Sequence, residues 1–198
     1  VRHPLNKGFS LSEQYFSVQH CLSVSVIPME QDFQLPDDAT FEAEIPEPFK
    51  ISNTLVQLDL SNARSLRQIS DDIGYLVEVI NQQSRKINLL MAHILMQEDN
   101  PEYRHLTLSF GGSQITFRSS LPLTTGQRLR LKLFLREEAC AVYCYARISH
   151  IETDQDRALV TATYELIRND DRELLIRACS HEQSRQLKER AEKRYQLT

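Results

Sequence analysis

The residues best suited to chemistry are spread along the chain instead of being grouped. Six histidines occur, at positions 3, 20, 93, 105, 150 and 181, and no two of them are three or four residues apart. That spacing would place two imidazoles on one face of a helix, so its absence predicts no helical metal site. The acidic pairs at 71–72 and 170–171 lie near expected helix starts, where carboxylates stabilise the positive end of the helix dipole without a catalytic role.

The candidate nucleophiles lack the sequence context that activates them. Ser109 is not in a Gly-x-Ser-x-Gly turn, and the sequence has neither a P-loop nor a Gly-x-Gly-x-x-Gly motif. Cys140 and Cys144 lie in the stretch AlaCysAlaValTyrCysTyrAla, where a period of two places both on one strand face as small, buried, reduced thiols. We therefore predict that the protein is not an enzyme, with no catalytic residues, no metal site and no resident cofactor.

Two of the five glycines are adjacent, Gly111 and Gly112, and they stand between two short apolar stretches. Glycine is needed where the backbone takes a positive φ or where another group approaches the chain closely. A tight turn explains the pair, and so does a close approach. The sequence leaves both explanations open.

The overall composition is that of an ordinary globular protein. The 198 residues are 41% hydrophobic and 25% charged, with a net charge of −4. Because a basic footprint is lacking, we expect no nucleic-acid polymer as a partner. No apolar run reaches the roughly 18 residues of a membrane span, so no membrane insertion is expected. Reduced cysteines predict a cytoplasmic location, and a start at Val1 instead of Met predicts that the true N-terminus lies upstream.

The elements that must position these residues fall into four segments. They are an N-terminal segment contributing strands (1–60), a long coiled-coil helix (61–99), a β domain (103–168) and a C-terminal helix (169–198). Partial alternation predicts strands over Tyr15–Pro28 and Thr40–Ile45. Pro46 and Pro48 are expected to keep the next stretch from entering a helix early. Residues 54–60 suit either a strand or an early helical turn, which leaves the helix start undecided between 51 and 62.

Five short apolar runs separated by turn residues occupy the β segment. They span 106–110, 114–118, 129–135, 139–151 and 158–166. Strands at this spacing predict a small antiparallel barrel or sandwich, and hence a mainly β member of the α+β class. The helix expected over 170–195 has mixed charges at helical spacing. This pattern is typical of a solvated, salt-bridged face, with a partner-docking surface as the alternative.

The long helix carries a heptad pattern. No proline occurs between Phe49 and Asn100, and Pro101 ends the segment. With Leu66 at position a, a seam with a period of 3.5 comprises Leu66, Ile69, Ile73, Leu76, Ile80, Gln83, Ile87, Leu90 and Ile94. A surface helix with a period of 3.6 drifts off such a seam, so the pattern predicts a coiled coil.

Length supports assembly through this helix. About 36 residues at 1.5 Å each make a rod of roughly 54 Å, whereas a compact domain of this size is only about 40 Å across. We expect the seam to pack on a second copy; the alternative is a helix packed wholly on its own β domain. The apolar residues 89–96 are expected to contact both the β domain and a partner helix.

Two features of the seam bear on the number of chains. Ile at a with Leu at d favours two strands. Val77 and Met91 at position e and Val79 at position g widen the apolar face, which favours three or four. Gln83 supplies one polar layer, which either fixes the register at some cost in stability or is a tolerated defect open to solvent.

One stretch of the β segment resembles the core of a PilZ domain. It runs ThrLeuSerPheGlyGlySerGlnIleThrPheArg at 107–118, then LeuProLeuThrThrGlyGlnArgLeuArgLeuLysLeuPheLeu at 121–135. PilZ domains are small six-stranded barrels that act as bacterial receptors for cyclic di-GMP, so the resemblance implies a PilZ-like barrel. The family carries an Asp/Asn-x-Ser-x-x-Gly motif. Ser109 and Gly112 match it, and Thr107 replaces the acidic or amide residue; these three are the candidate cyclic di-GMP-binding residues.

The chain is more closely similar to the atypical, tetrameric branch of this family, in which a long heptad helix is inserted ahead of the barrel segment. The stretch ArgLysIleAsnLeuLeuMetAlaHisIleLeu at 85–95 carries this resemblance, which covers roughly residues 62–185. It implies a barrel formed partly by strands within 14–50, interrupted by the helix and completed by 104–167. It also implies a homo-oligomer, with a tetramer favoured over a dimer.

The upstream Arg-x-x-x-Arg motif of the family is not present in this sequence. Arg168 with Arg172 and Arg190 with Arg194 have the spacing, but they follow the barrel, and we interpret them as chance matches on a solvated face. In the family these arginines clamp phosphate and stack on guanine, which needs a planar guanidinium. Their loss predicts weak or absent cyclic di-GMP binding.

Three functions fit these observations. The first is a non-enzymatic, self-assembling adaptor in cyclic di-GMP-linked control of motility, pili, biofilm or virulence, acting through unknown protein partners. The second is a genuine cyclic di-GMP receptor that uses Thr107, Ser109 and Gly112 with arginines from upstream residues or a neighbouring subunit. The third is a structural coiled-coil scaffold with a barrel head.

Overall fold

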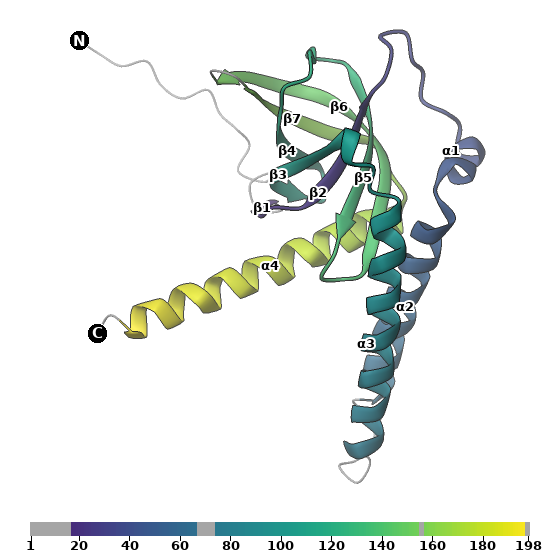
Figure 1. Ribbon diagram of the computed structural model, residues 1–198, viewed down its shortest axis with the longest axis vertical. Helices are drawn as coiled ribbons and strands as arrows, with labels where there is room; N and C mark the ends of the chain where they lie inside the picture. The colour runs from purple at the N-terminus through teal and green to yellow at the C-terminus, as the bar shows by residue number, and fades with distance from the viewer. Residues whose placement is uncertain (1–16, 67–73, 155–156, 197–198) are drawn as a thin grey trace.

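A closed ring of six antiparallel strands forms the head of the molecule (Figure 1). The computed structural model describes residues 17–66, 74–154 and 157–196. Around the ring the order is β3–β2–β5–β6–β7–β4, and β4 pairs with β3 to close it. The strands are β2 (Ser23–Pro28), β3 (Arg104–Gly111), β4 (Gln114–Ser119), β5 (Arg128–Leu135), β6 (Cys140–Asp154) and β7 (Arg157–Leu166). The predicted α+β fold with a small antiparallel barrel is confirmed.

Alternation along the strands fills the barrel with apolar side chains. Leu129, Leu131 and Leu133 of β5 are fully buried, and Cys140 and Cys144 of β6 belong to the same core. The predicted placement of both thiols on one buried strand face is therefore confirmed. Burial raises the pKa of each thiol far above its usual value, so both are inert packing groups.

The single strand expected over Tyr15–Pro28 is divided in two. β1 (Ser17–Gln19) pairs with the C-terminal half of β3, whereas β2 pairs with its N-terminal half. Residues 20–22 link the two strands and cross β3 between these pairings, where the backbone N–H of His20 donates to the carbonyl of Leu108 at 3.1 Å. We refer to residues 20–22 as the β1–β2 link.

The strand predicted over Thr40–Ile45 is wrong, because this segment forms helix α1 (Asp38–Glu44). Asp37 caps the helix by accepting a hydrogen bond from a backbone N–H three residues ahead at 2.8 Å. The alternating apolar residues also fit a helix, since Phe41 and Ile45 are four residues apart and both are buried. The short apolar pattern fits a strand period of two and a helix period of 3.6 equally well, and the cap at Asp37 favours the helix.

Helix α2 (Glu47–Leu66) begins well before residue 61, so the segment 54–60 is helical. Pro48 lies in its first turn, where the amide that proline lacks would have no intrahelical partner. The carbonyl of Pro46 accepts a hydrogen bond from the backbone N–H of Phe49 at 2.9 Å. The two prolines therefore start the helix instead of delaying it, and the fully buried Phe49 anchors it to the barrel.

The long helix expected over 61–99 is two helices in the structure. α2 ends at Leu66, and α3 (Gly74–Gln97) runs back beside it as an antiparallel partner (Figure 1). The hydroxyl of Ser84 on α3 donates to Asp59 on α2 at 3.1 Å. The sequence between the helices includes SerAspAsp at 70–72, residue types with low helix propensity. At 1.5 Å per residue α3 is only about 36 Å long, shorter than the single rod expected.

A second apolar core joins the helices to the outside of the barrel. It contains the buried residues Phe41, Ile45, Phe49, Met91, Leu95, Phe134, Ala141, Tyr143 and Tyr145. The hydroxyls of Tyr143 and Tyr145 both donate to Glu44 at the end of α1. The expected contact of the C-terminal third of the helical segment with the barrel is confirmed. A short 3-10 turn, η3 (Pro101–Tyr103), then leads into β3.

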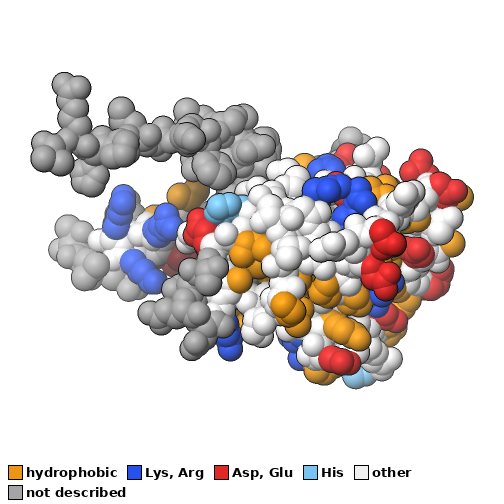
Figure 2. Space-filling view, turned by 90° about the horizontal axis from the view of Figure 1, so that it is seen from above, with side chains coloured by type: hydrophobic (Ala, Val, Ile, Leu, Met, Phe, Trp, Pro, Cys, Tyr) orange, Lys and Arg blue, Asp and Glu red, His pale blue; other side chains and the backbone are white. Residues whose placement is uncertain are grey.

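Helix α4 (Asn169–Gln196) covers the barrel with its first half and projects away with its second (Figure 1). Leu174, Leu175 and Ala178 are buried in the barrel core, whereas residues 187–194 are all exposed. Figure 2 shows Lys and Arg side chains along this projecting end and Asp and Glu side chains at the opposite end of the molecule. Among the described residues, no helix combines the length and apolar character that a membrane span requires.

Candidate functional site

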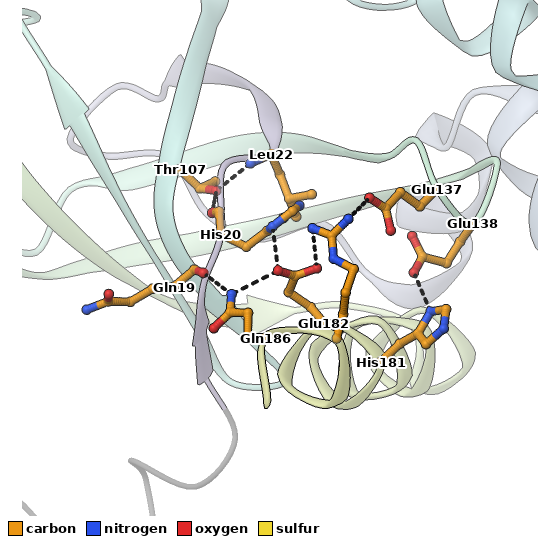
Figure 3. A network of polar contacts seen from close by, with 10 residues as sticks. Gln19, His20, Leu22, Thr107, Glu137, Glu138, His181, Glu182 and Gln186 are labelled. Atoms are coloured by element: carbon orange, nitrogen blue, oxygen red, sulfur yellow. Dashed lines mark hydrogen bonds and ion pairs between the residues drawn. The ribbon is translucent and has the colours of Figure 1, made fainter. Parts of the chain in front are cut away.

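Thr107, the first of the candidate ligand-binding residues, is 2% exposed. Its hydroxyl donates to the carbonyl of His20 at 2.7 Å and accepts from the backbone N–H of Leu22 at 2.8 Å (Figure 3). Both contacts are to the β1–β2 link. Thr107 thus ties the link to β3, and its one hydroxyl proton is already used within the chain.

Ser109 and Gly112 do not share this environment. The register of the pairing of β3 with β4 shifts between Thr107 and Ser109, and Ser109 is half-buried beyond this shift. Gly112 lies under α4, where a Cβ atom would come within 2.6 Å of Ile176. Of the two explanations left open for this glycine, the close approach is the one observed, and the approaching group is α4.

The arginines with family-like spacing have structural contacts. The guanidinium of Arg168 pairs with the buried Asp171 at 2.9 Å and with Glu42 at 3.3 Å. That of Arg172 donates to the carbonyl of Gly112 at 2.7 Å. The predicted solvated face is therefore wrong for Arg168 and Arg172, which fasten α4 to the barrel and to α1, whereas the chance match of their spacing to the family motif stays a prediction.

A cleft of about 720 Å³ lies beside Thr107 and is rich in cationic side chains. Arg104 of β3, Arg118 of β4 and Arg157 of β7 line it together with His105, and none of its described lining residues is acidic. The Nε of Arg104 is also 3.0 Å from the carboxylate of Asp99. Sequence spacing could not indicate this cleft, because its three arginines come from three different strands.

On the other side of the link, α4 meets the barrel through a polar network (Figure 3). Nδ1 of His20 lies 3.2 Å from the Glu182 carboxylate, and Arg185 bridges Glu182 and Glu137 at 2.8 and 2.9 Å. Burial acts to raise the pKa of Glu182, but hydrogen bonds from Gln186 and Arg185 and the charges of His20 and Arg185 outweigh it, so this pKa is lowered. Glu182 is therefore a buried carboxylate kept ionised by its neighbours.

Nearby, Glu138 behaves in the opposite way. Burial raises the pKa of this carboxyl, with a further contribution from the charge of Glu137 that His181 and His20 oppose. The same network closes the edge of β1, since the amides of Gln183 and Gln186 donate to the carbonyls of Ser17 and Gln19. The link, the β5–β6 turn and α4 are thereby held together by charge and hydrogen bonding.

The predicted oligomerisation seam is bare where the structure describes it. Leu76, Gln83, Ile87, Leu90 and Ile94 are exposed, Ile80 is half-buried, and Leu76 and Leu90 expose 53% and 68% of their surface. Ile69 and Ile73 and the side chain of Leu66 lie outside the described residues. Met91, expected to widen the seam, is instead buried against the barrel at 7% exposure. Leu89 and Met96, both at position c and outside the seam, are also exposed.

The barrel and its glycine-bearing strand define a class of protein. The family model for the PilZ domain matches residues 81–181, just over half of the chain. The chain therefore belongs to the PilZ domain family, which is linked to cyclic di-GMP signalling. A sequence comparison with functionally curated proteins finds no match.

Solved structures of similar fold extend this comparison. One is a pathogenic protein from Xanthomonas campestris, described as a new tetrameric PilZ domain self-assembled through an unusual helical bundle. It is 14% identical with a TM-score of 0.54, over 87% of this chain and 90% of that one.

Two further structures match over less than half of either chain. MotI/DgrA, the inhibitor of motility from Bacillus subtilis, is 24% identical with a TM-score of 0.39, over 41% of this chain and 42% of its own. MrkH from K. pneumonia in its apo state is 13% identical with a TM-score of 0.36, over 42% and 43%.

Proposed function

We propose that this protein is a non-enzymatic, self-assembling adaptor of cyclic di-GMP-linked signalling in the bacterial cytoplasm, serving motility, pili, biofilm formation or virulence. It acts by contacts with itself and with other proteins. The observation that carries the proposal is the bare seam on α3, where four large aliphatic side chains at heptad positions are exposed to water. Such a row is an aggregation hazard unless covered, and heptad spacing is what a second helix covers.

We favour four chains over two. The Xanthomonas protein of similar fold is described as a tetramer assembled through a helical bundle. In this chain Leu89 and Met96, both at position c, expose further apolar surface on a face of α3 away from the seam, and α3 already lies along α2. Apolar surface on more than one face of the helix suits a bundle of several helices better than a two-stranded coil.

The assembly is tested by light scattering on the full chain at tens of micromolar. We expect a mass of about four times the 23.0 kDa of one chain. Ile87→Asp places a carboxylate in the seam, where burial without a partner is costly, and is expected to give a single-chain mass. Asn81→Asp adds the same charge at an exposed position outside the seam and should leave the assembly intact. A wild-type chain that remains a monomer would refute the proposal.

We propose further that cyclic di-GMP binding is weak or lost. Thr107 stands where the family motif has an acidic or amide residue, and its hydroxyl is used by the β1–β2 link. Gly112 lies under Ile176 of α4. These contacts support an adaptor in which the motif residues serve the fold.

The cationic cleft favours a second candidate function, that of a genuine receptor. Arg104, Arg118 and Arg157 line it beside Thr107, and guanidinium groups are suited to phosphates. Calorimetry with cyclic di-GMP separates the two functions. The adaptor predicts no stoichiometric micromolar binding. Binding that Arg157→Ala or Ser109→Ala abolishes, and that Arg190→Ala on the projecting end of α4 leaves unchanged, would establish the receptor instead.

A further inference from the structure

We propose that His20, Glu137 and Glu182 form a binding site for one transition-metal ion of the Zn²⁺ type. The three residues come from three elements, the β1–β2 link, the β5–β6 turn and α4 (Figure 3). One ligand atom of each lies within 4.8 Å of the others. Imidazole and carboxylate together are a donor set that Zn²⁺ accepts.

The separation of the donor atoms suits such an ion. In a tetrahedral site with bonds of about 2.0–2.1 Å, ligand atoms lie about 3.3 Å apart. Nδ1 of His20 and Oε1 of Glu182 are already 3.2 Å apart. Only Glu137, which is half exposed and stands on a turn, has to move inward. The ion needs rotations of exposed side chains and no change in the barrel.

The most buried ligand is supported from behind. Glu182 is 7% exposed, and the side-chain amide of Gln186 donates to its Oε1 at 2.8 Å. Gln186 also donates to the carbonyl of Gln19 at 2.7 Å, which fixes this amide against β1. Metal-ligating groups are commonly oriented by a second layer of hydrogen bonds of this kind.

A cation already occupies the position between the carboxylates. The guanidinium of Arg185 lies 2.9 Å from Glu137 and 2.8 Å from Glu182. Because 47% of the Arg185 side chain is exposed, it can turn out into solvent without leaving a buried charge. A divalent ion would replace this guanidinium and bridge His20 and Glu182. Arg185 is therefore the competitor that sets the affinity.

Access to the site is open. A cavity of about 510 Å³ is lined by His20, Glu137 and Glu182 and also by Cys21 and Glu138. It is large enough for the ion to arrive with water molecules that complete its coordination. Bound metal would clamp α4 to the link that Thr107 holds, which adds a metal-dependent joint to the barrel.

The site is tested by calorimetric titration of the full chain with ZnCl₂ in a buffer that does not chelate zinc. We expect one ion per chain. His20→Gln and Glu137→Gln should each weaken binding by at least about tenfold. Arg185→Gln should tighten it several-fold because it removes the competing cation. His150→Gln is the matched control, since this histidine also lies 3.2 Å from a glutamate, Glu152, on the exposed surface of β6.

Two results would overturn the assignment. The first is a chain in which neither the wild type nor Arg185→Gln binds Zn²⁺. The second is binding that His150→Gln weakens as much as His20→Gln does, which would identify ordinary surface adsorption. Both results leave the assembly test on Ile87 untouched, so the metal site and the proposed function fail independently.

Discussion

Two regions bear on function, the surroundings of the β1–β2 link and the exposed seam of α3. They differ in whether their side chains have partners within the same chain. Around the β1–β2 link, the polar groups of Thr107, Glu182 and Arg185 find partners within the same chain. Along α3, among the described residues, Leu90 and its heptad neighbours Ile87 and Ile94 are exposed, although Met91 beside Leu90 is buried. The first region is held together within one chain, whereas in the proposed assembly a helix of another chain would cover the second. The comparison separates residues that stabilise one chain from residues that we propose join chains.

The largest expected effect contrasts two neighbours on α3. Met91→Ala removes a side chain buried between α3 and the barrel and is expected to lower the free energy of unfolding by about 2–5 kcal/mol. Leu90→Ala truncates a side chain that is 68% exposed and should cost less than about 0.5 kcal/mol in dilute protein. Urea unfolding measures both changes.

The order of the two effects should reverse when assembly is measured instead of unfolding. Leu90→Ala is expected to weaken self-association because its side chain lies in the seam, whereas Met91→Ala should assemble once folded. Equal effects of the two substitutions on dilute unfolding, or no effect of Leu90→Ala on assembly, would show that α3 does not divide into an anchoring face and a joining face.

The next effect tests the contact between α4 and the barrel. Gly112→Ala places a Cβ atom within 2.6 Å of Ile176, and overpacking of this kind typically costs about 1–3 kcal/mol. Much of that cost should disappear in a protein that also carries Ile176→Ala. Gly74→Ala is the control, because no atom lies within 4 Å of a Cβ there. A Gly112→Ala protein as stable as the wild type would refute the close approach.

The barrel was predictable because its signal is local and repeated. Five alternating runs correspond to β3–β7, since a period of two with turn residues between the runs leaves little choice. The segment Thr40–Ile45 was not predictable from its period. Its apolar residues satisfy both a strand and a helix, and the cap at Asp37 decides. The division of residues 61–99 between α2 and α3 was also missed, because a heptad pattern does not indicate where one helix ends and the next begins.

The candidate site was predictable only in part. Ser109 and Gly112 are found through a contiguous motif, yet the close approach to Gly112 comes from Ile176, 64 positions later in a separate helix. The arginines of the cationic cleft and the ligands of the proposed metal site come from separate elements. No spacing rule finds them, because the fold brings them together.

A smaller effect is expected where Thr107 joins β3 to the link. Thr107→Val keeps the shape but leaves the backbone N–H of Leu22 without its hydrogen bond, and is expected to cost about 1–2 kcal/mol. Ser109→Ala, on the same strand, should change stability by less than about 0.5 kcal/mol. Thermal unfolding of the two variants decides this. If Ser109→Ala proves the more destabilising, the crossing of the link does not depend on Thr107.

The smallest effect is electrostatic and lies on the outer surface of the barrel. Partial burial acts to raise the pKa of Glu165, but hydrogen bonds from Arg128 and Arg147 outweigh it and lower this pKa below 4.5. A carboxyl with a lowered pKa in the folded state contributes stability above its unfolded pKa and loses it as the pH falls through the folded value.

Glu165→Gln should therefore cost less than about 1 kcal/mol at pH 7, as expected for an exposed ion pair, and nothing once the pH is well below 4.5. Unfolding at both pH values measures the difference. Because Glu165 is away from the α3 seam, assembly should be the same in both proteins. A cost that persists at low pH would mean that the glutamate acts through packing instead of charge.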